Sequence, residues 1–181
     1  MKNTRKGFSL IELVVSVGLF AVVMLLSTGA YLSLISLDRK ARATNDLVTN
    51  LSFAIDTMER SLRTGSEFTC GGEDVGGSTS DCLSGRESIS FVNEQNQTIT
   101  YKQIETTLQQ CTGLVCDSLT DPRITIEDVR FFVRGTGTTG PAATQQPWVT
   151  FSIKGTITPD STNGPITFTI QSTASQRKID L

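Results

Sequence analysis

The chain has 181 residues with four cysteines, one tryptophan and no histidine, and its formal net charge is −2. The missing histidine excludes nucleophiles activated by imidazole, histidine-ligated zinc and histidine pH switches. A hydrophobic share of 38 % is modest for one compact globule, and no basic stripe with interleaved aromatic residues supports nucleic-acid binding.

The amino-terminal region is basic and then strongly apolar. Three positive charges fall within the first seven residues, on Lys2, Arg5 and Lys6. The 25 residues from Leu13 to Leu37 carry no formal charge. About 20 helical residues cross a bilayer, whereas the apolar region of a secretory signal has roughly 7 to 15. We therefore expect a membrane-spanning helix; the alternative is a secretory signal cleaved before Tyr31, after the small residues Thr28 and Ala30.

A short motif joins these two parts: Lys6-Gly7-Phe8-Ser9-Leu10-Ile11-Glu12-Leu13. It resembles the leader-cleavage motif of type IV prepilins and type II secretion pseudopilins, in which a basic leader ends in glycine and a glutamate follows five residues later. The resemblance covers residues 2–30. It implies that a membrane aspartyl peptidase, the prepilin peptidase, cuts between Gly7 and Phe8 and methylates the new amino terminus of Phe8.

The residue types suit that processing. Gly7 has no side chain, so an extended backbone can enter a narrow protease cleft. An unpaired carboxylate is costly in an apolar surrounding, so Glu12 would favour a neighbouring subunit whose positive amino terminus docks beside it. By resemblance, Glu12 guides assembly; without the motif, a solvated Glu12 at the membrane boundary would be the simpler interpretation.

Two further features concern the apolar run. Many members of the family carry a proline late in this helix, whereas this chain has Gly18 and Gly29, which suit flexible points or close helix packing. Basic residues also follow the run, at Arg39, Lys40 and Arg42, so the positive-inside rule is nearly balanced. The leader resemblance and the cysteines downstream favour a cytoplasmic amino end.

An amphipathic pattern follows the membrane run. Apolar or small residues alternate at spacings of four and three: Leu37, Ala41, Thr44, Val48, Leu51, Ile55, Met58 and Leu62. No glycine or proline interrupts this segment before Gly65, which suits a helix stop. We expect one helix from Phe8 to Thr64, about 85 Å long at ~1.5 Å per residue, with its second half lying on a sheet. A free coiled coil is the alternative.

Beyond Gly65 the chain is rich in glycine, serine and threonine and contains short alternating segments typical of strands. The expected strands are Ser88–Asn93, Thr98–Ile104, Ile124–Arg134, Trp148–Gly155 and Ile166–Ser172. Residues 94–97 suit a hairpin turn, and residues 135–147 and 158–165 suit exposed loops. The sequence thus predicts an α+β fold, a long helix packed on an antiparallel sheet.

All four cysteines lie in this outer part, at Cys70, Cys82, Cys111 and Cys116. Three pairings are possible, and we favour Cys70 with Cys82 and Cys111 with Cys116 because each closes a local loop. Each bond could stabilise a small head by about 2 to 4 kcal/mol. A zinc site of four thiolates is disfavoured because paired CxxC spacing is absent.

Acidic residues gather at Asp117, Asp121, Glu127 and Asp128, and some pseudopilins bind calcium. Their spacing matches no EF-hand, so solvated loops are the favoured interpretation. Glycines 71, 72, 76 and 77 form no phosphate-binding pattern. We predict no catalytic residue, no metal site and no cofactor.

The predicted organisation has four parts: a cleaved leader (residues 1–7), a transmembrane and fibre-core helix (8–37), its amphipathic continuation (38–64) and a disulfide-bonded extracytoplasmic head (65–181). The resemblance implies a structural subunit that is held in the cytoplasmic membrane and then enters a cell-surface filament. Its implied partners are the prepilin peptidase, other pilin or pseudopilin subunits, pilus or secretion assembly machinery, and membrane lipid.

The tail Ser172–Leu181 faintly resembles minor pilins and J-type minor pseudopilins, which makes a minor subunit an expectation. Two alternatives remain at this stage. One is a membrane-anchored extracellular binding module that never polymerises. The other is a secreted enzyme with an ordinary signal, for which no acid–base or nucleophile constellation is found.

Overall fold

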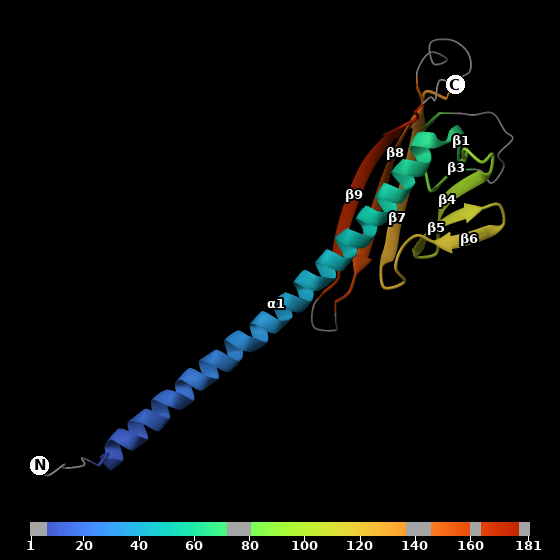
Figure 1. The fold of residues 1–181 in the computed structure, drawn as a ribbon. Helices are drawn as coiled ribbons and strands as arrows, with labels where there is room; N and C mark the ends of the chain where they lie inside the picture. Colours follow the sequence, from blue (N-terminus) through green and yellow to red (C-terminus); the bar gives the residue numbers. More distant parts are fainter. Residues whose placement is uncertain (1–6, 72–80, 137–145, 160–163, 178–181) are drawn as a thin grey trace, which may run out of the picture. The chain divides into compact units, whose positions relative to one another are not determined.

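The computed structural model describes residues 7–71, 81–136, 146–159 and 164–177 (Figure 1). Helix α1 (Leu10–Thr64) is followed by strands β1 (Ser66–Cys70), β2 (Cys82–Arg86), β3 (Ser88–Val92), β4 (Thr98–Ile104), β5 (Thr107–Thr112), β6 (Val115–Ser118), β7 (Thr125–Arg134), β8 (Trp148–Ile157) and β9 (Ile166–Ser175). The chain divides into two compact units, Met1–Arg42 and Ala43–Leu181. The expected α+β class is confirmed.

Helix α1 has 55 residues and runs without interruption through both glycines of the apolar run. It begins two residues later than predicted and ends at the predicted residue, Thr64. An added Cβ at Gly18 or Gly29 would meet nothing within 4 Å. The helix thus continues through both glycines, and each glycine leaves open space on the helix surface.

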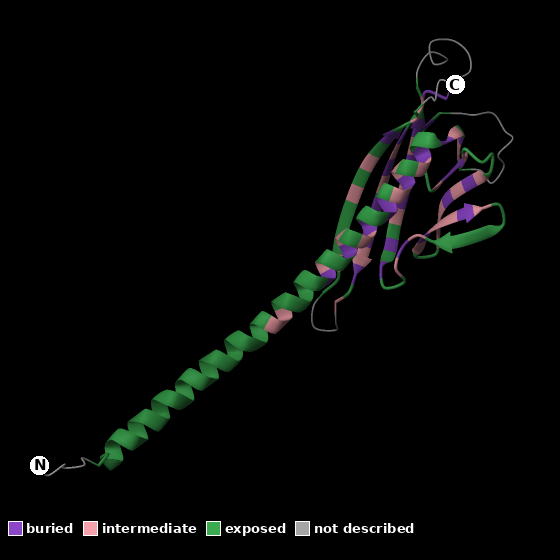
Figure 2. Ribbon diagram, in the orientation of Figure 1, coloured by how far each residue is buried: buried purple, intermediate pink, exposed green. Residues whose placement is uncertain are grey.

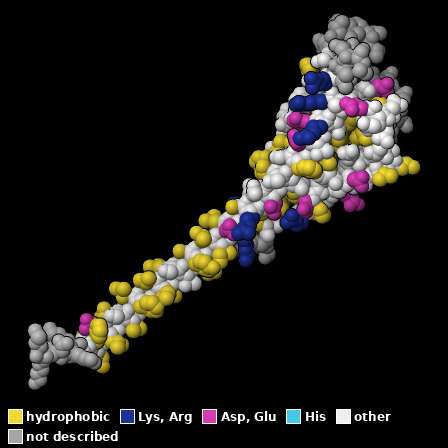
Figure 3. Space-filling model, viewed as in Figure 1, with side chains coloured by type: hydrophobic (Ala, Val, Ile, Leu, Met, Phe, Trp, Pro, Cys, Tyr) yellow, Lys and Arg dark blue, Asp and Glu magenta, His cyan; other side chains and the backbone are white. Residues whose placement is uncertain are grey.

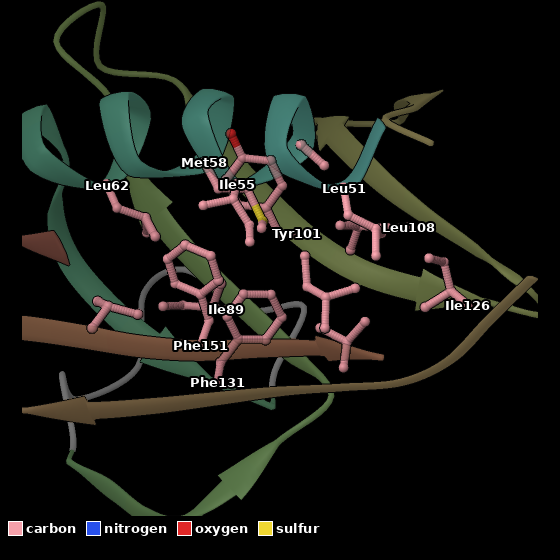
Figure 4. Close-up of a cluster of buried hydrophobic side chains, with 14 of the residues drawn as sticks. Leu51, Ile55, Met58, Leu62, Ile89, Tyr101, Leu108, Ile126, Phe131 and Phe151 are labelled. Atoms are coloured by element: carbon pink, nitrogen blue, oxygen red, sulfur yellow. The ribbon is translucent and has the colours of Figure 1, made fainter. Parts of the chain in front are cut away.

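The second half of α1 buries one face against the sheets, as predicted (Figure 4). The buried residues are Ala43, Leu47, Leu51, Ala54, Ile55, Met58 and Leu62. The predicted stripe is correct from Leu51 onward but wrong before it, because Leu37 and Ala41 are exposed and Leu47, not Val48, is buried. A straight helix drifts ~20° per heptad relative to a strict seven-residue repeat, so a stripe on a sheet does not follow a coiled-coil seam.

The strands form two antiparallel sheets. The order is β1-β3-β4-β5-β6 in the five-stranded sheet and β2-β7-β8-β9 in the four-stranded sheet. An added Cβ on Gly155 of β8 would lie 3.2 Å from Leu51 Cδ1 and 3.4 Å from Leu47 Cδ1. The helix therefore packs closely against the four-stranded sheet at this glycine, where a side chain would press on Leu51 and Leu47.

All five predicted strands are present, as β3, β4, β7, β8 and β9, with ends shifted by up to three residues. Four strands were not predicted, namely β1, β2, β5 and β6. The predicted turn at 94–97 is present: the backbone N–H of Asn93 donates to the carbonyl of Gln97 at 2.9 Å, and Asn96 has a φ of 58°.

The helix and both sheets share one core, in which Leu62, Phe91 and Phe131 are among the fully buried side chains. The rings of Phe68 and Tyr101 lie 5.9 and 5.8 Å from that of Phe91. An added Cβ on Gly65 would overlap Phe91 Cδ2 and lie 3.0 Å from Cε2. Gly65 does end the helix as predicted, but close approach to an aromatic ring, not a positive φ, requires glycine there.

A carboxylate connects β2 to the end of β7. The Asp81 carboxylate accepts hydrogen bonds from the backbone N–H and the hydroxyl of Thr136, both at 2.9 Å. The hydrogen bond from the Thr136 backbone lowers the pKa of Asp81 below its ordinary value. Gly135 and Thr136 are buried, so the prediction of an exposed loop is wrong at these two residues, while residues 137–145 lie outside the described part.

Candidate processing and assembly site

Helix α1 begins with an N-terminal cap whose residues can be recognised in the sequence. The backbone N–H of Glu12 donates to Ser9 Oγ at 3.3 Å, and the N–H of Leu13 donates to the Ser9 carbonyl at 3.2 Å. Ser9 is thus the N-cap, and Glu12 occupies the third helical position, the spacing of a capping box. The S-x-x-E pattern could have identified Ser9, to which the sequence interpretation gave no role.

The bond between Gly7 and Phe8 lies just before this cap, outside the helix. Phe8 is 82 % exposed, and an added Cβ on Gly7 would meet nothing within 4 Å. This segment is exposed and lies outside the helix, so a protease can reach its backbone. The leader residues Lys2, Arg5 and Lys6 lie outside the described part of the chain.

Glu12 lies in the first turn of α1 and is exposed. Its carboxylate forms no ion pair among the residues that the structure describes, while its backbone carbonyl accepts from Ser16 Oγ at 2.7 Å. A negative charge in the first turn interacts favourably with the helix dipole. Within the described residues, the Glu12 side chain is therefore exposed at the start of the helix and has no cation beside it.

Helix α1 contains a segment long and apolar enough to cross a membrane, and none of that segment is buried within the chain. Figures 2 and 3 show this part of the helix as exposed and covered with hydrophobic side chains. The first charged group after it is Asp38, which pairs with Arg42 at 2.9 Å. An apolar helix of this kind at the amino end fits a single-pass membrane anchor.

The structure contains disulfides between Cys70 and Cys82 and between Cys111 and Cys116. The first joins β1 of one sheet to β2 of the other, and the second joins the paired strands β5 and β6. These are the two pairings favoured by the spacing. No free cysteine is present among the residues described.

Three of the four acidic residues weighed as a calcium site, Asp121, Glu127 and Asp128, each have a cationic side chain as a neighbour. Asp121 bonds to Arg123 at 3.1 Å and Glu127 to Lys154 at 2.6 Å, and these cations lower the pKa of each carboxylate. Within the described ranges, no three acidic, cysteine or histidine side chains are grouped closely enough to hold a metal ion.

Two open hollows can be described on the part of the head that the structure covers. One, of about 350 Å³, is lined chiefly by polar side chains such as Arg60, Asn93 and Gln110; the other, of about 430 Å³, lies beside Phe53, Asp121 and Arg123. Neither hollow joins a nucleophile to a general base among its lining residues. We therefore assign no reaction to the residues that line these two hollows.

The comparisons with known proteins concern the amino-terminal segment. Residues 2–28 match a family model described as the prokaryotic N-terminal methylation motif. Neither a curated protein nor a solved structure gave a match. The matched segment contains Gly7, Phe8 and Glu12 and extends into the apolar part of α1. The motif is typical of structural subunits cleaved by the prepilin peptidase and assembled with other pilins, rather than of enzymes.

Proposed function

Because the chain carries the methylation motif of type IV prepilins and pseudopilins, we propose that it is a structural subunit of a type IV pilus or a type II secretion pseudopilus. The observation that carries this proposal is the motif at the start of an exposed, membrane-length apolar helix. In this proposal residues 1–7 are the cleaved leader, and Phe8 becomes the N-methylated first residue of the mature chain.

The helix serves in two environments. Residues 8–37 first span the cytoplasmic membrane, with lipid around the apolar side chains, and later pack against the same segment of other subunits in the fibre core. Gly18 and Gly29, which leave open surface on the helix, allow neighbouring helices to approach closely there. Residues 38–64 continue the helix, and residues 65–181 form the extracytoplasmic head on the filament surface.

Glu12 guides the entry of each subunit. Its exposed carboxylate has no cationic partner among the described residues, and burial in a fibre core would leave that charge costly. The positive amino terminus of a neighbouring Phe8 supplies the opposite charge and fixes the axial position of the incoming subunit. The tail resemblance favours a minor subunit, at a tip or initiating position.

Mass spectrometry of the native protein tests the processing. We expect a mature chain that begins at N-methylated Phe8. A chain that begins at Met1 or Lys2 would support the non-polymerising membrane anchor instead, and a start near Tyr31 would support ordinary secretion.

The assembly role is tested by Glu12→Leu. We expect this variant to insert into the membrane and to be cleaved normally, but to enter filaments at least tenfold less than the wild type. Glu12→Asp, which keeps the charge, is the matched control and should retain most incorporation. Normal incorporation of Glu12→Leu would remove the charge-pairing argument while leaving the processing result intact.

A further inference from the structure

Strand β9 is the outer strand of the four-stranded sheet (Figure 1). Its ten residues pair with β8 in one continuous antiparallel register, from Ile166 opposite Ile157 to Ser175 opposite Trp148. No other strand of the described chain pairs with its far edge. In such a strand about half of the backbone N–H and C=O groups point away from the single partner.

The other three sheet edges are short or irregular, and β9 is neither. Strand β6 has four residues, and β1 and β2 have five each, with a shift of register in their pairing. Strand β9 has ten residues, no charged residue, no proline and no bulge. Natural sheets protect long edges with lysine, proline or bulges, so this edge lacks the usual protection against pairing.

The two faces of β9 differ in a way that indicates the chemistry of a partner strand. One face carries Ile170, which packs on the core, and the buried Ala174. Phe168 lies on the same face by alternation but remains 41 % exposed. The opposite face carries exposed Thr167, Thr169, Gln171 and Thr173. An added strand with an apolar side chain beside Phe168 would cover this ring.

We propose that β9 accepts an extended, uncharged strand from another subunit of the same assembly, which lengthens the four-stranded sheet by one strand. The inference rests on the proposed function, because it takes its partner from the filament. Backbone hydrogen bonds supply the affinity, and Phe168 selects an apolar residue at one position. A charged partner strand would lose hydration beside an edge that has no charge to offer.

The occupant is a strand other than a second β9. Pairing of β9 with β9 is isologous and closes a pair around a two-fold axis. Subunits of a filament are related by a screw operation, so their contacts join different surfaces of successive subunits. The edge of β9 therefore faces a different segment of the neighbour.

The test uses the full chain in detergent and an uncharged labelled peptide, WVTFSITGTI, which is the β8 sequence with threonine in place of Lys154 and carries a short polyethylene glycol tail for solubility. We expect saturable binding and at least tenfold slower hydrogen exchange of β9 amides when the peptide is bound. Thr169→Lys combined with Gln171→Lys restores the protection that natural edges have and should weaken binding at least tenfold. Thr125→Lys, on the interior strand β7, is the matched control and should bind as the wild type does.

Two results would overturn the inference. One is unchanged hydrogen exchange in β9, or equal binding by the wild type and the double lysine variant. The other is efficient disulfide crosslinking of Gln171→Cys between copies without peptide, which would identify a second β9 as the occupant. Because the assay requires neither cleavage nor polymerisation, its failure is distinct from a mature chain that does not begin at Phe8.

Discussion

Replacement of Gly65 by alanine tests the close contact between the end of the helix and the aromatic core. The new Cβ would overlap Phe91 Cδ2 and lie 3.0 Å from Cε2 and 3.2 Å from Cγ. The Phe91 ring is fully buried between Phe68 and Tyr101, so it cannot move aside without displacing them. Gly65 has no positive φ, so the backbone itself would accept alanine.

The expected size of the effect follows from two opposing contributions. Overpacking a close-packed core by one methyl group costs about 1 to 3 kcal/mol. Alanine also has less backbone freedom than glycine in the unfolded chain, which raises the free energy of unfolding by about 0.4 to 1 kcal/mol. We therefore expect Gly65→Ala to lower the free energy of unfolding by about 1 to 2 kcal/mol, which corresponds to a Tm lower by roughly 2 to 8 °C for a domain of this size.

Fluorescence of Trp148, the single tryptophan, reports unfolding of the head in guanidinium with the full chain in detergent. Gly164→Ala is the control, because its added Cβ would meet nothing within 4 Å. It should be neutral or slightly stabilising. Adding Phe91→Leu should reduce the cost of Gly65→Ala, since it removes the overlapping ring atoms. The reasoning is refuted if Gly65→Ala is as stable as the wild type.

Two further predictions concern the head. Met58→Ala removes a fully buried side chain and should lower the free energy of unfolding, measured by denaturant titration, by about 2 to 5 kcal/mol. Leu114→Ala, at a fully exposed position, is the control and should change it by less than about 0.5 kcal/mol. Because the folded state lowers the pKa of Asp81, its carboxylate stabilises the head above its unfolded pKa, near 3.8, and loses this contribution as the pH falls through the lower, folded value. The difference in urea midpoint between the wild type and Asp81→Asn should therefore be full at pH 6 and shrink below pH 4; a difference independent of pH would contradict this origin.

The long elements of this fold were predictable because their own residues specify them. A charge-free run is followed by an amphipathic stretch without glycine or proline, and together they indicate one continuous helix up to Gly65. Alternation of Val149, Phe151 and Ile153 with polar residues similarly identifies β8. The motif around Gly7, Phe8 and Glu12 identified the amino-terminal segment for the same reason, since it is local.

The missed strands depend on partners and not on their own pattern. Strand β2 contains Gly85 at a φ of 73°, where the ring of Phe132 leaves no room for a Cβ, so no alternation is visible in its sequence. Strand β6 is exposed at all four residues and is defined by pairing with β5 and by the bond from Cys111 to Cys116. The Cys-Thr-Gly-Leu-Val-Cys segment did contain a hairpin signal, a glycine between two closely spaced cysteines.

The position of β9 also sets the order in which the head can form during synthesis. The hydroxyl of Ser172 donates to Glu59 Oε1 across 113 residues of sequence, and the backbone N–H of Arg177 donates to the carbonyl of Arg63 at 2.7 Å. Strand β9 thus contacts a helix that leaves the ribosome well before it. Contacts of such long sequence separation slow folding, because loop closure must precede them. The head therefore completes its fold only after β9 has been synthesised, and until then the part of the helix that β9 contacts stays uncovered.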